Sequence, residues 1–360
     1  MICPLRNGAG VTHLSSSAPL KKGIEVRKTV LLLALMVLAV LASCAAQKAG
    51  MGPTKPTSPS QNGKIAFTRV DNQVGEFEIF VVEPDGSGLR KLTTKPVQDG
   101  FPAWSPNGKR LAFEAESQGG NSEVNIDIYV MNADGSELER ITKEPTFDSM
   151  TSWSPDGSRM AFSMVDISSM FSSASASSSA RSIRDSSNEN GIYTITADGA
   201  DLHQLTDNRL DEYPAWSPDG KTIAFNRLTK TSGGIYTVNE DGGGLRKLTD
   251  PPEGFWDSEP SWSPDGTKIA FTRGSGERSG RPDVFTMNAD GTHLRKLTGK
   301  TEGAYSPDFS PDGKRIVFVG WKAGNKLYVM NADGTDVRRL TKTQAAIDEN
   351  APDWQPLPSS

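Results

Sequence analysis

Carboxylates are the side chains of this sequence that could do chemistry at a regular spacing. Acidic residues stand five positions before a recurring aromatic residue in five of six places, with Ala304 at the sixth: Asp99, Asp148, Asp211, Asp257 and Glu349. If a closed architecture brings them around one opening, like charges about 10 Å apart repel by roughly 0.4 kcal/mol per pair in water. Such a ring would attract a cation, or a peptide that carries Lys, Arg or a free amine. The local alternative is that each carboxylate accepts hydrogen bonds from the next backbone N–H groups and stabilises a turn.

Side chains for other kinds of catalysis are scarce. Beyond the N-terminal segment the chain has two histidines, His203 and His293, both beside a basic Leu-Thr segment and unsuited to a ligand cluster or a catalytic base. No G-x-S-x-G motif and no D-x-D-x-[DN]-G calcium loop occur. We therefore expect no enzyme and no cofactor, with two exceptions left open. Two carboxylates of the ring could perform acid–base catalysis, and the ring could hold a cation.

A repeated phrase must position these carboxylates. It reads WSPNGKRLAF from 104, WSPDGSRMAF from 153, WSPDGKTIAF from 216, WSPDGTKIAF from 262 and FSPDGKRIVF from 309. A second apolar run, an Asp-Gly pair and a closing Leu-Thr or Ile-Thr follow each copy. The repeats are about 45–49 residues apart, except for one interval of 63. Self-similarity at this period is typical of propellers and other repeat architectures.

Each repeat predicts four strands. The apolar runs are rich in Ile, Val, Tyr, Phe and Thr and end at Asp-Gly or Asn-Gly, the signature of strands joined by tight hairpins. The middle runs are almost continuously apolar, as in sheets covered on both faces. The first repeat lacks its P-x-W strand, and the last fragment, 349–354, supplies one. We therefore predict an all-β fold, a six-bladed β-propeller of four-stranded antiparallel blades over residues 62–356, closed by the C-terminal strand, with a short tail at 357–360.

The repeat closely resembles the TolB-type propeller repeat, also called the WD40-like or PD40 repeat. The shared pattern is P-x-W-S-P-D-G-x-x-I-A-F, then I-Y-V-M-N-x-D-G, then L-T, and the resemblance covers about residues 62–356. It implies the propeller fold, and by analogy with TolB it implies another envelope protein as the partner. TolB carries an additional N-terminal α/β domain, whose contribution is not carried over to this chain.

The two faces of the predicted disc differ in what they carry. The S-P-D-G and N-A-D-G turns share one face and are expected to be scaffold, with Arg and Lys on the outer strands protecting exposed edges. Variable loops and the connections between repeats share the other face, where Tyr213, Trp256 and Trp321 could anchor a partner. Phe101 is among the further aromatic residues on this face that could contact a partner. A Ser-rich insertion at 168–190 is expected to be a tolerated loop.

The N-terminal region predicts export. The apolar run 29–44 follows a basic stretch and ends in Leu-Ala-Ser-Cys, which resembles the lipobox of bacterial lipoproteins. We predict a signal peptide at 1–43 and a lipidated Cys44 with a flexible tether over 44–61; an ordinary signal peptide or an uncleaved anchor are the alternatives. Cys3 and Cys44 are the only cysteines, so the folded region contains no disulfide. Removal of residues 1–43, which carry a net charge of +4, would leave −9, which argues against nucleic acid as a partner.

These features predict a monomeric, lipid-anchored extracytoplasmic propeller at the bacterial envelope. It would bind a protein or peptide with a basic segment through an acidic channel mouth. The alternative is a propeller that binds carbohydrate or another small ligand, including a polysaccharide-active enzyme.

Overall fold

The computed structural model describes residues 62–93, 98–118, 124–166, 190–275, 281–299, 303–322 and 324–357. The predicted signal peptide, Cys44, the tether, nearly all of the Ser-rich insertion and the last three residues lie outside these ranges. Over the described ranges, no helix is long and apolar enough to cross a membrane.

The described chain is built from strands in groups of four, and we call these groups blades 1 to 6. Blade 1 contains β24 (Ile347–Trp354), β1 (Ile65–Asp71), β2 (Glu76–Val82) and β3 (Arg90–Lys91); blade 2 contains β4 (Asp99–Trp104), β5 (Arg110–Gln118), β6 (Val124–Asn132) and β7 (Glu139–Arg140); blade 3 contains β8 (Thr146–Trp153), β9 (Arg159–Asp166), β10 (Gly191–Thr196) and β11 (His203–Gln204). Blade 4 contains β12 (Asp211–Trp216), β13 (Thr222–Leu228), β14 (Gly233–Asn239) and β15 (Arg246–Lys247); blade 5 contains β16 (Phe255–Trp262), β17 (Lys268–Ser275), β18 (Asp283–Asn288) and β19 (Arg295–Lys296); blade 6 contains β20 (Ala304–Phe309), β21 (Arg315–Gly320), β22 (Lys326–Asn331) and β23 (Arg338–Arg339).

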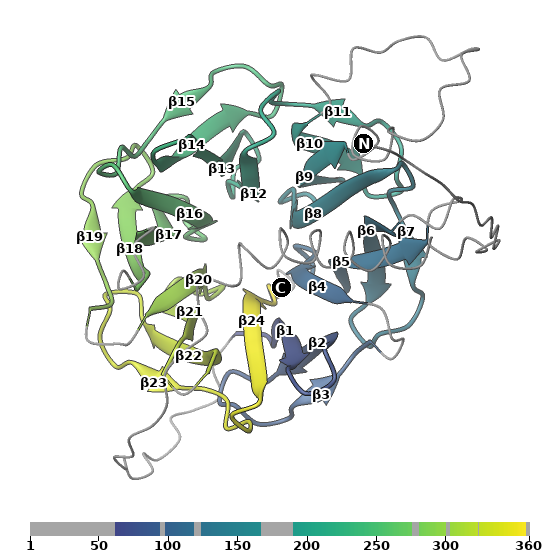
Figure 1. Cartoon of the computed structure of the whole chain (residues 1–360), viewed down its shortest axis with the longest axis vertical. Helices are drawn as coiled ribbons and strands as arrows, with labels where there is room; N and C mark the ends of the chain where they lie inside the picture. The colour runs from purple at the N-terminus through teal and green to yellow at the C-terminus, as the bar shows by residue number, and fades with distance from the viewer. Residues whose placement is uncertain are drawn as a thin grey trace, which may run out of the picture. The chain divides into compact units, whose positions relative to one another are not determined.

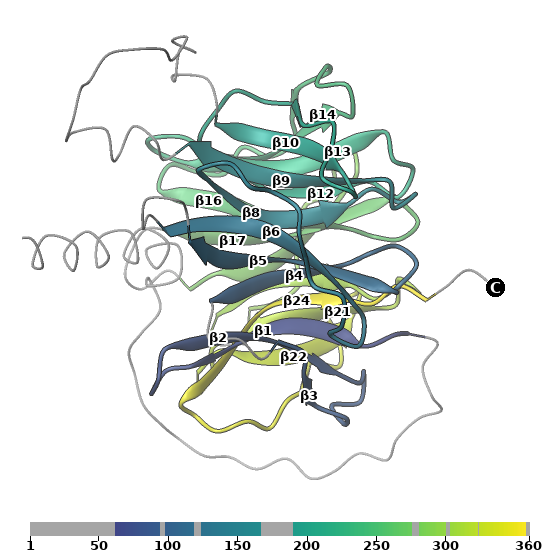
Figure 2. The same cartoon turned by 90° about the vertical axis from the view of Figure 1, so that its right-hand side faces the viewer.

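The blades surround a common centre, with the first strand of each blade innermost and the two-residue strand at the rim (Figure 1). Seen from the side, the strands stack as a thick disc (Figure 2). Neighbouring innermost strands contact one another, and β24 contacts both β20 and β4. The prediction of an all-β propeller is thus confirmed.

The two ends of the repeat array meet in blade 1. β24 pairs antiparallel with β1, with Ile65 opposite Trp354 and Arg69 opposite Glu349. The side chain of Trp354 donates a hydrogen bond from Nε1 to the carbonyl of Gly63 at 3.0 Å. This bond joins the C-terminal end of β24 to the residues just before β1. The C-terminal strand therefore covers the edge of β1 that would otherwise be unpaired.

The repeated phrase builds the blade cores and the turns. Its phenylalanine is fully buried in every blade, at Phe67, Phe113, Phe162, Phe225, Phe271 and Phe318. Burial of each such side chain contributes roughly 1.5–3 kcal/mol. In the S-P-D-G turn of blade 3, Asp156 accepts hydrogen bonds from Ser154 Oγ at 2.6 Å and from the Ser158 N–H at 3.0 Å. Gly157 follows with φ +72°, a conformation that glycine adopts without strain.

Candidate functional site

The innermost strands enclose a cavity of about 280 Å³ along the centre of the disc. All six contribute lining residues, among them Phe101, Met150, Tyr213, Glu259, Ser306 and Ala351. A second hollow of about 660 Å³ shares Asp308 and Asp353 with the first and reaches the S-P-D-G turns at Pro264 and Pro311. We call the two hollows together the channel. The channel opens on the face that carries the S-P-D-G turns, which were expected from the sequence to be purely structural.

A backbone irregularity turns these side chains into the channel. Each innermost strand has a register shift against its neighbour, and one non-glycine residue at the shift has positive φ: Phe101 (48°), Met150 (59°), Tyr213 (56°), Glu259 (55°), Ser306 (48°) and Ala351 (47°). This conformation is uncommon for such residues and costs on the order of 1–3 kcal/mol each. The surrounding structure compensates part of the cost, because preceding blades accept the freed N–H groups. Thr68 Oγ1 accepts from the Phe101 N–H at 3.0 Å, and Glu259 Oε2 accepts from the Ser306 N–H at 2.8 Å.

One wall of the channel, from blades 2 to 4, is apolar and aromatic. Phe101 and Tyr213 meet edge to face with ring centroids 5.9 Å apart, and Met150 holds the equivalent position between them in the chain. Burial, together with nearby Glu259, Glu212 and Glu114, raises the pKa of Tyr213 well above its usual value, so the phenol stays neutral.

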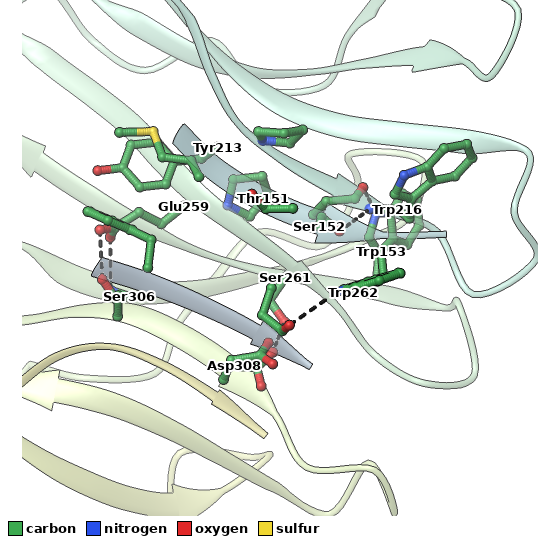
Figure 3. Close-up of a pocket in the computed structure, with 18 of the residues that line it drawn as sticks. Thr151, Ser152, Trp153, Tyr213, Trp216, Glu259, Ser261, Trp262, Ser306 and Asp308 are labelled. Carbon is green, nitrogen blue, oxygen red and sulfur yellow. Dashed lines mark hydrogen bonds between the residues drawn. The ribbon is translucent and has the colours of Figure 1, made fainter. Parts of the chain in front are cut away.

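The other wall, from blades 5, 6 and 1, carries carboxylates. Glu259 accepts hydrogen bonds from Ser306 Oγ at 2.7 Å and from the Ser306 N–H at 2.8 Å (Figure 3). It also accepts from Thr272 Oγ1 at 2.6 Å. Farther along, Asp308 accepts from Ser261 Oγ at 2.8 Å and from the Trp354 N–H at 2.8 Å. These carboxylates also join one blade to the next.

Asp308 and Asp353 are two carboxyl groups that interact electrostatically where blades 6, 1 and 2 meet. Asp353 accepts from the Trp104 N–H at 2.6 Å, so the two carboxylates hold consecutive innermost strands together. Burial raises the pKa of Asp308 to about 6. Burial and then the charge of Asp308 raise the pKa of Asp353 well above its usual value. At neutral pH the pair therefore holds charge against a desolvation penalty.

No basic side chain offsets these carboxylates within the described lining. The residues around both parts of the channel include Glu259, Asp308, Asp312 and Asp353 but no Lys, Arg or His. The channel is thus acidic on one wall and apolar on the other. Such a surface suits a ligand that has a cationic group beside an apolar one.

The predicted acidic ring is not at the channel surface, and its exposure was wrongly predicted. All five carboxylates are buried: Asp99, Asp148, Asp211, Asp257 and Glu349. In blades 4 and 5 each is held by a bidentate arginine on the adjacent strand. Arg227 donates to Asp211 at 2.6 and 2.6 Å, and Arg273 donates to Asp257 at 2.6 and 2.7 Å.

Glu349 is held in a third way. It accepts from the hydroxyls of Thr341 and Thr343, and from the N–H of Leu327 at 3.2 Å. The physical reason for the burial is the register shift in each innermost strand. Alternation alone would put residues two positions apart on the same face, but the positive φ at the shift turns the later residue into the channel and leaves these acids buried. The local alternative, hydrogen bonds from the next backbone N–H groups, is also wrong for Asp211, Asp257 and Glu349, because their partners come from an adjacent strand or an adjacent loop.

Of the three predicted aromatic anchors, only Tyr213 lines the channel. Trp256 is half-buried against Gly274, where an added Cβ would lie 2.7 Å from the indole ring. Trp321 is half-buried against Gly303, and its ring lies 6.1 Å from that of Tyr305 in an edge-on contact. Both tryptophans are packing residues.

Sequence reasoning missed Met150, Glu259, Asp308 and Asp353, although it named Phe101 among the aromatic residues that could contact a partner. These residues occupy the two variable positions on either side of the proline of P-x-W, which is replaced by Thr151 in blade 3. The signal that could have found them is variation inside an otherwise repeated phrase: the position before this proline or threonine reads Phe, Met, Tyr, Glu, Ser and Ala around the ring.

Comparison with known proteins fits this geometry. The model of the TolB beta propeller domain family, PD40, matches residues 56–207 and 208–356. The chain belongs to the TolB β-propeller family. The resemblance expected from the repeat is thus confirmed.

Solved structures extend the likeness of this TolB-family propeller. TolB from Acinetobacter baumannii is 22% identical with a TM-score of 0.64, over 94% of this chain and 74% of that one. A TolB candidate from Agrobacterium tumefaciens is 20% identical with a TM-score of 0.57, over 82% and 99%. Oligogalacturonate lyase in complex with manganese is 15% identical with a TM-score of 0.51, over 75% and 72%. At these identities the likeness concerns the fold alone. Among curated proteins, none matches the sequence.

The described part of this TolB-family propeller contains no group of three or more His, Cys, Asp or Glu side chains arranged to hold a metal. His203 and His293 are exposed, His203 on the outer strand β11 and His293 just before β19. One structure of similar fold, oligogalacturonate lyase, is an enzyme, but at 15% identity this likeness does not decide whether the present chain is one.

Proposed function

We propose that this TolB-family propeller is a protein- or peptide-binding module of the bacterial envelope, exported and lipid-anchored through Cys44, with six blades closed into a ring. The observation that carries the proposal is the division of the channel. Glu259, Asp308 and Asp353 face a cavity whose opposite wall is Phe101, Met150 and Tyr213, and no basic residue of the described lining offsets the charge.

The physical chemistry favours a cationic partner. A Lys, Arg or amino-terminal group 4 Å from one of these carboxylates gains on the order of 4 kcal/mol at an effective dielectric constant of about 20. The same group lowers the cost of keeping Asp308 and Asp353 both charged. An adjacent apolar side chain would cover the Phe101–Tyr213 wall and contribute burial energy. The partner segment is therefore basic and apolar together, in an extended form narrow enough for the channel.

Membership of the TolB family supports a role in protein interaction at the envelope. The N-terminal sequence supports export, since an apolar run leads to the lipobox-like Leu-Ala-Ser-Cys. A Cys44→Ser variant tests the anchor directly. We expect the protein to leave the membrane fraction and to lose labelling by radioactive palmitate; retention of both would refute lipidation.

Site-specific photo-crosslinking of the full chain in cells tests the channel. A benzoyl-phenylalanine at position 101 would probe the apolar wall, and one at position 138, an exposed leucine near the rim, is the matched control. We expect a crosslinked protein from position 101 and not from 138, lost in a variant with Asp308→Asn and Asp353→Asn. Its adduct should map to a segment with a basic residue. Crosslinks that survive the double substitution, or that arise equally at both positions, would refute the channel as the site.

A small cationic ligand is the second candidate. The inner cavity of about 280 Å³ is close to the lower end of small-molecule sites, roughly 300–1,000 Å³. Calorimetric titration with amino sugars and short amines would decide this. Micromolar binding that depends on Glu259, with no protein crosslink from position 101, would favour this second function.

A further inference from the structure

A buried cluster of oxygen ligands lies between blades 2 and 3, away from the channel. β6 and β8 meet in a parallel pairing with Ile126 opposite Phe147. Because side chains alternate along a strand, Asn125 and Asp127 share one face of β6, and Thr146 and Asp148 share one face of β8. All four are buried, with Asp127 and Asp148 at 0% exposure. The Thr142 hydroxyl lies 3.5 Å from Asp127 Oδ1.

Several oxygen atoms of this cluster lack a protein hydrogen-bond partner among the described residues. They are both carboxylate oxygens of Asp148, Oδ1 of Asn125 and Oγ1 of Thr146. Thr142 and Thr146 lie beside Asp148, although neither hydroxyl makes a direct hydrogen bond to its carboxylate. A buried carboxylate without a partner is costly, so these oxygens face a gap that needs a positive charge or a proton.

The residues around the gap carry too little positive charge to balance their carboxylates. Asp127 is paired with Arg140, whose Nη2 lies 2.9 Å from Oδ2, and it also accepts from the Ser117 hydroxyl. Glu144 acts on Asp148 with a further negative charge. One arginine thus faces two buried carboxylates and a third nearby, which leaves Asp148 uncompensated.

Blades 4 and 5 carry a built-in cation at this place, whereas Asp99 in blade 2 stands opposite Ala115. The residue opposite Asp211 is Arg227 and the residue opposite Asp257 is Arg273, but the residue opposite Asp148 is Met164. Between blades 6 and 1, the buried ammonium of Lys326 occupies the position that Asp127 has in blade 2, and it donates to the carbonyls of Gln344 and Ile347.

We propose that a calcium-type cation binds between blades 2 and 3, held by Asp148, Asp127, Asn125, Thr142 and Thr146. Calcium takes six to eight oxygen ligands at about 2.3–2.6 Å and accepts carboxylate, amide and hydroxyl oxygens in irregular arrangements. Magnesium fits less well, because it demands octahedral geometry and retains its water. The bound ion replaces the guanidinium of blades 4 and 5 and joins β6 to β8.

Thermal unfolding of the full-length chain, treated with EDTA and then titrated with calcium chloride at pH 7.5, tests the site. We expect the melting temperature to rise by about 5 °C at calcium 100-fold above its Kd, with a smaller effect of magnesium. Asp148→Asn should abolish the response. Met164→Arg should raise the melting temperature without calcium and remove the response, because it installs the guanidinium that blades 4 and 5 already have. Asp308→Asn with Asp353→Asn should keep the full response.

Calorimetry should give one calcium per chain in the wild type and none in Met164→Arg. If calcium has no effect on the wild type, Asp148 is a protonated buried acid and the proposal fails. If calcium stabilises the wild type and Met164→Arg equally, or loses its effect in the channel variant, the ion binds elsewhere and the proposal also fails. Should Asp148→Asn not fold, Met164→Arg alone decides.

Discussion

Replacement of Asp308 by asparagine should stabilise the protein at neutral pH and destabilise it in acid. The carboxylate of Asp308 accepts two hydrogen bonds, from Ser261 Oγ and the Trp354 N–H, and the amide oxygen of asparagine can keep one of them without rearrangement. The lost bond costs about 1 kcal/mol. Against this stands the desolvation that raises the pKa of Asp308 from 3.8 to about 6. A shift of about two units corresponds to roughly 3 kcal/mol.

The sign follows from proton linkage. Because the folded pKa lies above the unfolded one, the folded state holds more protons between pH 3.8 and about 6, and the stability of the wild type falls as pH rises through that window. The Asp308→Asn variant has no ionisable group at this position, so its stability does not fall in this way as the pH rises. We expect the variant to be less stable by about 1 kcal/mol near pH 3.5 and more stable by about 2 kcal/mol at pH 7.5.

Urea unfolding at half-unit steps from pH 3.5 to 8 measures the difference. Asp265→Asn, on an exposed S-P-D-G turn, is the matched control. Hydrogen bonds from Ser263 and Thr267 lower the pKa of Asp265, so its carboxylate stabilises the fold above pH 3.8 and the variant should lose stability at neutral pH. A difference between wild type and Asp308→Asn that does not change with pH, or a destabilised variant at pH 7.5, would refute the reasoning. A gain in stability joined to a loss of crosslinking would show that the channel charge serves binding.

Three further outcomes are expected from the same structure. Arg273→Met leaves Asp257 buried without a counter-charge and should lower the free energy of unfolding by about 3–5 kcal/mol in urea titrations, whereas a loss below 1 kcal/mol would contradict the buried pair. The affinity of a basic peptide that binds the channel should fall up to about tenfold per pH unit below pH 6, as Asp308 takes up a proton; fluorescence anisotropy that is flat from pH 5 to 8 would count against it. Truncation before Ile347 removes β24 and exposes the edge of β1, so cooperative thermal unfolding should be lost or shifted down by at least 10 °C; unchanged melting would mean that β24 is dispensable.

The strands and their order could be predicted from the sequence because the signals for them lie within each repeat. The apolar runs, the Asp-Gly turns and the buried phenylalanines are short-range signals, and each occurs six times. The pairing of β24 with β1 was also within reach, since the first repeat lacks a strand and the last fragment provides one. These features need no knowledge of contacts between blades.

The channel lining could not be predicted in the same way. Phe101, Tyr213 and Glu259 have positive φ because the structure around them holds them there, and no such residue type favours that conformation on its own. The shift in register at this point decides which side chains face the channel. One residue of slip exchanges the two faces of a strand, which is why Asp211 and Asp257 were expected at the surface and lie between blades.

The buried acids also show how a repeat protein distributes function. Each junction between blades involves nearest neighbours alone, so each can balance its charge in its own way. Arg227 balances Asp211, threonines and a backbone N–H hold Glu349, and Asp148 has Met164 where an arginine could stand. Residues that are the same in every repeat hold the blades together, whereas residues that differ from blade to blade give the molecule its charge asymmetry. The acidic wall of the channel consists of such differing residues, and at the proposed cation site Met164 differs from the arginines of blades 4 and 5. In a propeller of this family, function should therefore be sought where the repeats disagree.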